Sequence, residues 1–214
     1  MTLSLQYLIR APKISKAKSP LLLLLHGYGS NEEDLFSFAS ELSDEYFVVS
    51  ARAPHNLGYG SYAWYAINFD ADENKFSDLE QAKASRDLIS TFIDELVAHF
   101  PIDPNKVTLI GFSQGTILSY AVALSYPEKV QRVVAMSGYL NLDMLLETYQ
   151  NNDFSNLSIF SSHGTDDQVI PVEWARNAKP VLKELNIDNT YKEYPIGHGI
   201  SPQSFHDFKH WLAN

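Results

Sequence analysis

Cysteine is absent from this chain of 214 residues. Its absence excludes disulfide bridges, thiolate metal sites and a cysteine nucleophile. Basic residues are also few, with 16 Lys and Arg against 26 Asp and Glu, so the formal net charge is −10. Because a charge of this sign repels phosphate backbones and anionic lipid headgroups, we expect no nucleic acid partner.

Long hydrophobic runs are absent as well. The most apolar stretch, Leu21 to Leu25, has five residues, whereas a membrane-spanning helix needs about twenty. The N-terminal sequence MTLSLQYLIR lacks the basic start and long apolar run of a secretory signal. We therefore expect a cytoplasmic protein without integral membrane association. The length and the 45% hydrophobic content, without a linker or repeat, predict one domain over residues 1–214.

Strand and helix patterns alternate along the chain. Short apolar runs predict strands at 3–9, 20–26, 46–51, 106–112, 131–137, 157–163 and 190–194. Helical periodicity predicts helices near 31–43, 78–99, 114–126, 141–150, 172–186 and 201–213. Capping boxes of Ser30 with Glu33 and of Ser77 with Glu80 mark two helix starts. The alternation predicts an α/β fold with a mostly parallel central sheet and helices on both faces.

A serine stands where a predicted strand turns into a predicted helix. The motif Gly111-Phe112-Ser113-Gln114-Gly115 fits the nucleophile elbow, which holds a serine in a strained turn above the sheet. A serine hydroxyl is a weak nucleophile and needs a base that is itself oriented by a carboxylate. Ser113 is therefore the candidate nucleophile.

Two later strands end in loops that carry the partners of such a serine. Residues 157–163 lead into a loop with Asp166 and Asp167, and residues 190–194 lead into a glycine-flanked His198. The order Ser, Asp, His is that of α/β-hydrolases. We take Asp167 as the orienting carboxylate and His198 as the base, with Asp166 as the alternative to Asp167.

A glycine-rich turn follows the strand at 20–26. In His26-Gly27-Tyr28-Gly29-Ser30, flexible glycines allow the backbone to turn N–H groups toward the nucleophile. We assign the oxyanion donors to the backbone N–H groups of Tyr28 and Gln114, the latter at a helix N-terminus. The alternative is a turn of structural use only.

Five segments together resemble the phospholipase/carboxylesterase family, which includes acyl-protein thioesterases: LLLLHGYGSNEEDL, SARAPHNLGYGSYAWY, GFSQGTILS, HGTDDQVIP and GHGIS. The resemblance implies an α/β-hydrolase without a separate cap domain that acts on carboxylic esters. It also favours Asp167 over Asp166, because the family's aspartate stands two places before the hydrophobic pair that precedes proline. Thr116 and Thr165 depart from the family pattern, and Thr116 puts the acyl-chain preference in doubt.

Aromatic residues are concentrated between Arg52 and Ser77, at positions Tyr59, Tyr62, Trp64, Tyr65, Phe69 and Phe76. They form either a wall of an apolar pocket or a satellite core under the loop. The resemblance implies that Trp64 and Tyr65 lie nearest the site. Leu140 is a further candidate for the acyl side, with a buried structural leucine as the alternative.

Ester hydrolysis through an acyl-enzyme is the function that these patterns favour, on a small-molecule carboxylic ester, with thioesters and lysophospholipids as further candidate substrates. We expect no cofactor and no metal, since His206 and His210 lack a third ligand. The alternatives are an amidase, peptidase or acyltransferase of the same fold and a non-catalytic binding domain. The oligomeric state is left open, a homodimer included.

Overall fold

A mixed seven-stranded sheet forms the centre of the molecule, with the strand order β1-β3-β2-β8-β9-β10-β11. The computed structural model describes residues 3–14, 16–69 and 75–214. Strand β1 is antiparallel to β3, and the other neighbours are parallel. The strands are β1 (Tyr7–Arg10), β2 (Ser19–Leu25), β3 (Phe47–Ala51), β8 (Ile102–Phe112), β9 (Arg132–Met136), β10 (Ser158–Gly164) and β11 (Asp188–Tyr194). The predicted α/β-hydrolase architecture is confirmed, although the first strand begins at Tyr7 rather than at residue 3.

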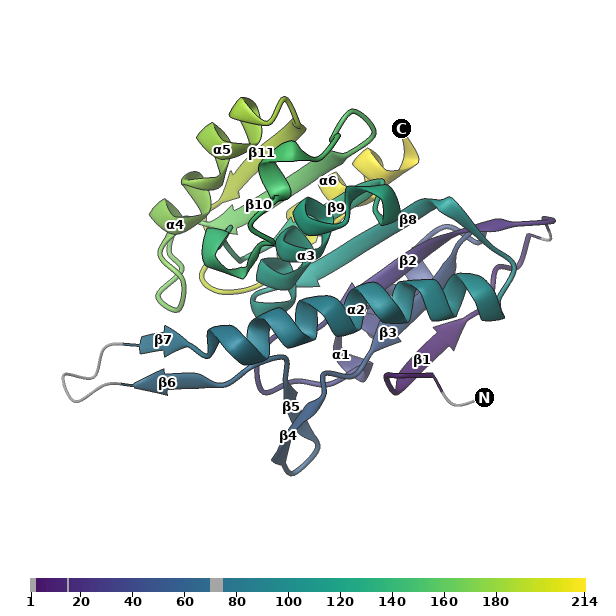
Figure 1. Cartoon of the computed structure of the whole chain (residues 1–214), viewed down its shortest axis with the longest axis horizontal. Helices are drawn as coiled ribbons and strands as arrows, with labels where there is room; N and C mark the ends of the chain where they lie inside the picture. Colours follow the sequence, from purple (N-terminus) through teal and green to yellow (C-terminus); the bar gives the residue numbers. More distant parts are fainter. Residues whose placement is uncertain (1–2, 15, 70–74) are drawn as a thin grey trace.

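Helices cover both faces of the sheet, with α2 and α3 in front of it and α6 behind in the view of Figure 1. The α-helices are α1 (Glu33–Phe36), α2 (Leu79–His99), α3 (Gln114–Ser125), α4 (Val172–Arg176), α5 (Ala178–Glu184) and α6 (Pro202–Ala213). Short 3-10 helices are η1 (Ser37–Glu41), η2 (Pro127–Lys129), η3 (Leu142–Met144) and η4 (Tyr149–Asn151). Among the described residues, none of the helices is both long and apolar enough to cross a bilayer.

Three of the predicted helices differ from the structure. The predicted helix near 31–43 consists of the short α1 followed by the 3-10 helix η1. The prediction of a helix near 141–150 is wrong, because that segment contains only η3 and η4. The side chain of Asn141 accepts the N–H of Asp143, a local bond that competes with helix formation. The predicted helix 172–186 is divided into α4 and α5, and Pro180 cannot donate the N–H that a continuous helix would need there.

The predicted helix caps also need correction. Helix α2 is capped by Asp78, whose side chain accepts the N–H of Gln81 at 3.0 Å, one residue beyond the predicted Ser77 box. Ser30 does not cap α1; its hydroxyl donates to the Asp34 carboxylate at 2.8 Å. In both cases the predicted cap differs from the observed helix start by one or more residues, because several polar residues in these segments can serve as caps.

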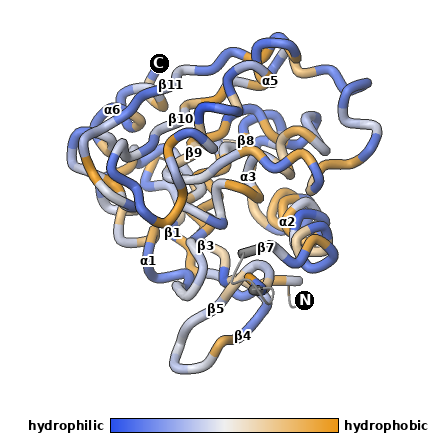
Figure 2. The backbone as a smooth tube through the Cα atoms, turned by 90° about the vertical axis from the view of Figure 1, so that its left-hand side faces the viewer, coloured by the Kyte–Doolittle hydropathy of each residue, from blue (hydrophilic) through white to orange (hydrophobic). Residues whose placement is uncertain are grey.

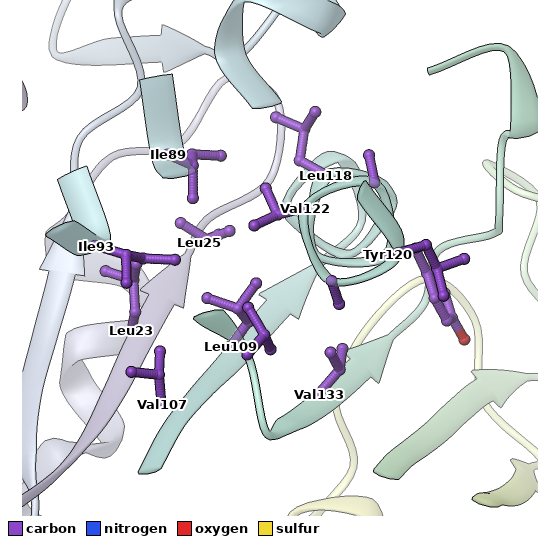
Figure 3. Packing of buried hydrophobic residues seen from close by; sticks show 14 of the residues in the cluster. Leu23, Leu25, Ile89, Ile93, Val107, Leu109, Leu118, Tyr120, Val122 and Val133 are labelled. Atoms are coloured by element: carbon purple, nitrogen blue, oxygen red, sulfur yellow. The ribbon is translucent and has the colours of Figure 1, made fainter. Parts of the chain in front are cut away.

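The leucines of β2 are buried on both faces of the sheet. Leu21, Leu23 and Leu25 belong to the core beneath α2 and α3, whereas Leu22 and Leu24 belong to the core beneath α1 and α6. Figure 3 shows Leu23 and Leu25 against side chains of α2, with residues of α3, β8 and β9 alongside. In Figure 2, helix α2 is hydrophobic on the side that faces the body of the molecule and hydrophilic on its outer side. Strand β2 is therefore a central strand, which places its carboxyl end in the middle of the sheet.

The described residues between Arg52 and Ser77 include two hairpins that extend from the body of the molecule (Figure 1). Their strands are β4 (His55–Gly58) with β5 (Ser61–Ala63), and β6 (Ile67–Phe69) with β7 (Lys75–Ser77). These strands were not predicted, because they are short and lack a clear apolar alternation. Of the aromatic residues in this stretch, the side chains of Phe69 and Phe76 lie outside what the structure describes.

Candidate active site

Ser113 lies in a strained turn between β8 and α3, with φ 54° and ψ −116°. The two flanking glycines permit this turn because neighbouring backbone leaves no room for a side chain. A Cβ on Gly115 would lie 1.9 Å from the carbonyl oxygen of Leu25, and one on Gly111 would lie 2.5 Å from that of Gly115. The Ser113 N–H donates to the Met136 carbonyl at 2.9 Å, which ties the turn to β9. A non-glycine residue at positive φ that is held by its surroundings is typical of a functional site.

Three loops bring Ser113, His198 and Asp167 together. The Nε2 atom of His198 lies 3.0 Å from the Oγ of Ser113, and its Nδ1 lies 2.7 Å from Oδ2 of Asp167. Since a carboxylate only accepts hydrogen bonds, Nδ1 carries the proton and the lone pair of Nε2 faces the serine hydroxyl. The serine proton can therefore pass to His198 without any rearrangement of the ring.

The Asp167 carboxylate is buried and fully satisfied. Its Oδ1 accepts the N–H groups of Val169 at 2.8 Å and Ile170 at 2.9 Å. Burial alone would raise the pKa of Asp167, but the hydrogen bonds from Ile170, His198 and Val169 together hold this pKa below its ordinary value. The neighbouring Asp166 is exposed, so of the two candidates only Asp167 contacts the histidine.

A serine that the sequence analysis did not single out supports the histidine loop. Ser137, at the end of β9, has φ 50° and donates its hydroxyl to the carbonyl of Gly199 at 3.0 Å. The His198 ring itself packs against the ring of Phe112, with 5.0 Å between centroids. The sequence could have indicated Ser137, because this residue directly follows a central strand.

The two predicted oxyanion donors line the same cavity as Ser113 and His198. Gln114 is the first residue of α3, where a backbone N–H has no acceptor within the helix. Its buried side chain accepts the N–H of Trp64 and donates to the carbonyl of Tyr65, both at 2.8 Å. Tyr28 is 45% exposed at the rim of the cavity.

The cavity has a volume of about 480 Å³ and a mostly apolar lining. Its apolar and aromatic residues are Tyr28, Tyr65, Ile67, Leu79, Ile117, Tyr139, Val169, Ile170 and Trp174; Ser77, Asn141 and Asp143 add polar groups. The rings of Tyr139 and Trp174 meet edge to face at 5.2 Å. Tyr139 and Val169 could have been found from their positions in loops after central strands, whereas Ile67 and Trp174 come from segments whose placement the sequence does not indicate.

The three predicted pocket residues have different positions. Tyr65 lines the cavity, and burial raises the pKa of its phenol, so the hydroxyl stays protonated. Trp64 does not line it: its side chain is fully buried and its indole N–H donates to the His26 carbonyl at 2.9 Å. Leu140 is also absent from the described lining and packs against the core. For Trp64 and Leu140 the structure favours the alternative of a structural role, because neither residue belongs to the described lining and both pack in or against the core.

Thr116 lies behind the nucleophile and not in the cavity. Its fully buried hydroxyl is 2.7 Å from the carbonyl oxygens of Gly111 and Met136 and accepts the Met136 N–H at 2.8 Å. The departure from the family pattern therefore changes the packing between α3 and the strand ends rather than the pocket wall.

The two histidines of the last helix, His206 and His210, lie on α6. The Nε2 atom of His210 is 3.4 Å from the side-chain nitrogen of Asn214. Within residues 3–14, 16–69 and 75–214, no three His, Asp or Glu side chains gather in an arrangement suited to a metal ion.

Comparison with known proteins identifies relatives along nearly the whole chain. The sequence profile described as Phospholipase/Carboxylesterase matches residues 9–214. Acyl-protein thioesterase 1 of Kluyveromyces lactis is 28% identical, over 95% of this chain and 94% of the relative. A probable carboxylesterase SOBER1-like protein of Arabidopsis thaliana is 30% identical, over 89% of this chain and 77% of the relative.

Solved structures agree on the architecture. The carboxylesterase of Bacillus cereus superposes with a TM-score of 0.84 at 23% identity, over 98% of this chain and 93% of that one. Acyl-protein thioesterase 2 of Zea mays gives a TM-score of 0.76 at 19% identity, with 97% of each chain covered. With the profile match to residues 9–214, these findings show that the chain belongs to the phospholipase/carboxylesterase family and is a serine ester hydrolase of the α/β-hydrolase fold.

Proposed function

We propose that the chain hydrolyses carboxylic esters and thioesters through an acyl-enzyme on Ser113. The observation that carries this proposal is the hydrogen-bonded series from Ser113 Oγ through the His198 ring to Asp167, at 3.0 and 2.7 Å. These are the distances at which a general base takes a proton from its nucleophile.

In the first half of the reaction, Ser113 Oγ attacks the carbonyl carbon while its proton moves to Nε2 of His198. The tetrahedral intermediate then collapses: the bond to the leaving oxygen or sulfur breaks, and His198 returns the proton to that atom. In the second half, water attacks the acyl carbon while one of its protons moves to Nε2 of His198. The bond to Ser113 Oγ then breaks, His198 returns the proton to Oγ, and the carboxylic acid leaves. Asp167 keeps the ring in its Nδ1–H tautomer and stabilises the imidazolium, which its pKa below the ordinary value allows.

The backbone N–H groups of Tyr28 and Gln114 are the proposed donors to the oxyanion. Both residues line the cavity beside Ser113, and Gln114 adds the positive end of the α3 dipole. Loss of one such donor typically lowers the rate by about 10²–10³-fold.

The cavity supports an acyl group of several carbons as the part of the substrate that is bound. Its lining is mainly aliphatic and aromatic, and Tyr65 forms part of the wall. Burial of apolar surface favours such a chain by roughly 0.8 kcal/mol per CH₂ group. A thioester presents the same carbonyl to Ser113, and relatives named acyl-protein thioesterase support thioesters as substrates.

The test is the initial rate of hydrolysis of p-nitrophenyl esters from acetyl to palmitoyl, with labelling by a fluorophosphonate probe. We expect turnover and labelling in the wild type and the loss of both in Ser113→Ala. Ser77→Ala is the matched control, because Ser77 lines the same cavity without contacting His198. Retention of esterase activity in Ser113→Ala contradicts the proposal. Labelling without ester turnover moves the search to matched anilides and acyl transfer.

A further inference from the structure

A buried histidine outside the series of Ser113, His198 and Asp167 contacts the backbone next to the nucleophile. His26 directly follows β2 and its side chain is completely inaccessible to solvent. Its Nδ1 lies 2.7 Å from the carbonyl oxygen of Gly27, and its Nε2 lies 3.1 Å from the backbone nitrogen of Ala53. The acyl-transfer steps described above do not use this imidazole.

The two contacts determine the tautomer of His26. A carbonyl oxygen only accepts, so Nδ1 carries a hydrogen; a backbone N–H only donates, so Nε2 carries a lone pair. The pKa of His26 is lowered, mainly because the ring is buried. The hydrogen bond to Gly27 and the charges of Asp34 and Glu32 raise this pKa by less, and the charge of Arg52 lowers it further. The ring is therefore neutral and held at both nitrogens.

The carbonyl that His26 holds belongs to the same peptide group as the N–H of Tyr28. In a planar trans peptide the C=O and the N–H point in opposite directions. Fixing the Gly27 oxygen against the imidazole therefore directs the Tyr28 N–H away from it. A second, longer bond, from the Ser30 N–H to the same oxygen at 3.3 Å, closes the turn but leaves the orientation to the shorter contact.

This peptide group lies beside the nucleophile. A Cβ placed on Gly27 would be 3.4 Å from the Cβ of Ser113 and 3.2 Å from the Phe112 ring. Tyr28 lines the cavity with Ser113 and His198. The N–H of Tyr28 is therefore close to the position where a tetrahedral oxyanion would form.

Trp64 connects His26 to the other proposed donor. Its indole N–H donates to the His26 carbonyl at 2.9 Å, and its backbone N–H donates to the side chain of Gln114 at 2.8 Å. The backbone on both sides of the oxyanion site is thus held by one buried network.

We propose that His26 is a positioning residue, whose Nδ1–H orients the Gly27–Tyr28 peptide so that the Tyr28 N–H stabilises the oxyanion. This inference rests on the proposed function, in which Tyr28 is an oxyanion donor. It assigns to His26 an effect on the transition state and not on substrate binding, because the oxyanion exists only in the transition state and intermediate.

The test compares His26→Leu with His26→Asn. The two replacements have the same shape, but asparagine places an N–H donor at the δ position and can keep the bond to Gly27. For His26→Leu we expect kcat to fall by about 10²-fold with KM within about twofold. Affinity for a trifluoromethyl ketone, which forms a tetrahedral adduct, should fall by the same factor. For His26→Asn we expect kcat within about fivefold of the wild type, since the δ donor remains.

Rates are expressed per active site, from fluorophosphonate stoichiometry, so that partial misfolding does not count as a catalytic effect. A purely structural role predicts equal losses in the two variants; that result, or a wild-type kcat in His26→Leu, overturns the inference. An inactive wild type, or an active Ser113→Ala, indicates instead that the proposed function has failed. The tautomer is then read directly from imidazole ¹⁵N shifts of the wild type: a protonated Nδ1 is expected, and a protonated Nε2 overturns the inference without reference to activity.

Discussion

The Nε2 atom of His163 lies 3.3 Å from Oδ2 of Asp167, and both side chains are fully buried. The same nitrogen is 2.9 Å from the carbonyl oxygen of Ile170, which can only accept, so Nε2 carries the hydrogen. Oδ2 is also the oxygen that faces His198. In the described part of the chain, Nδ1 of His163 has no hydrogen-bond partner. The Nε2–H of His163 therefore lies beside both the Ile170 carbonyl and the Asp167 oxygen that His198 contacts.

We predict that His163→Leu lowers kcat about tenfold, because the lost contact is worth about 1–2 kcal/mol of positioning. His163→Gln, whose amide N–H reaches the same position, should retain most of the activity. The measurement is kcat and KM for one p-nitrophenyl ester, together with the melting temperature. Equal kcat values in the leucine variant and the wild type would show that His163 only fills space.

Asp167→Asn should lower kcat by about 10³–10⁴-fold, since the amide would present N–H to the histidine and favour the tautomer that cannot accept the serine proton. Asp166→Asn is the matched control, because Asp166 is exposed and one residue away. Its kcat should stay within about twofold of the wild type. Single-turnover acylation rates of the two variants decide between the carboxylates; a reversed order would assign the role to Asp166.

Thr116→Val should destabilise the protein by about 1–3 kcal/mol, because the hydroxyl is buried among backbone groups that would lose their partner. Thr116→Ser keeps the hydroxyl and should lose less stability. Urea unfolding measures the free energies. Since Thr116 does not line the cavity, the acyl-chain optimum should be the same in both variants. A changed optimum would contradict the position of Thr116 behind the nucleophile.

Charge selection by the cavity should depend on Asp143. No Lys or Arg occurs in the described lining, and Asp143 is its only carboxylate; the aromatic pair of Tyr139 and Trp174 belongs to the same lining. We expect butyrylcholine to be preferred over its uncharged 3,3-dimethylbutyl isostere. Because Asp143 is exposed, Asp143→Asn should reduce this preference by only about two- to fivefold. Added salt should weaken the wild-type preference. If Asp143→Asn leaves the preference for butyrylcholine unchanged, the prediction for Asp143 is contradicted, and the aromatic rings are then the source of the preference.

Stability in acid should depend on Glu193, which accepts two hydrogen bonds from Arg176, at 2.8 and 2.7 Å. The Arg176 contact lowers the pKa of Glu193 to about 2 from 4.5. An ionised carboxylate whose pKa is lower in the folded than in the unfolded protein stabilises the fold at a pH above the unfolded pKa. This stabilisation is lost as the pH falls toward the folded pKa. The stability difference between wild type and Glu193→Gln should therefore shrink from pH 6 to pH 3. Urea unfolding checks this, with the more exposed Glu173→Gln as control.

The helix and strand patterns were predictable wherever burial sets a period. The leucine run of β2 could be recognised because both of its faces enter a core, and α2 could be recognised because every third to fourth side chain enters one core. Local polar contacts were less predictable: the caps at Ser30 and Ser77 were wrong, since neighbouring polar residues compete for the same orphan N–H groups.

The sequence by itself determined the type and order of the proposed site residues. Ser113, Asp167 and His198 each follow a strand, and the carboxyl ends of parallel strands share one edge of the sheet. The sequence also determined that Gly111 and Gly115 flank the serine. The elbow requires glycine at both positions, because neighbouring backbone atoms leave no room for a Cβ there.

Only the tertiary structure decided which side chains line the cavity beside Ser113. Trp64 and Tyr65 are adjacent in sequence, yet Tyr65 lines the cavity and Trp64 is enclosed behind His26. Likewise, the buried Nε2 atom of His26 accepts the backbone N–H of Ala53, which belongs to a separate loop of the chain. Such contacts depend on how separate loops meet in space, and the periodicity of a single segment contains no information about that meeting.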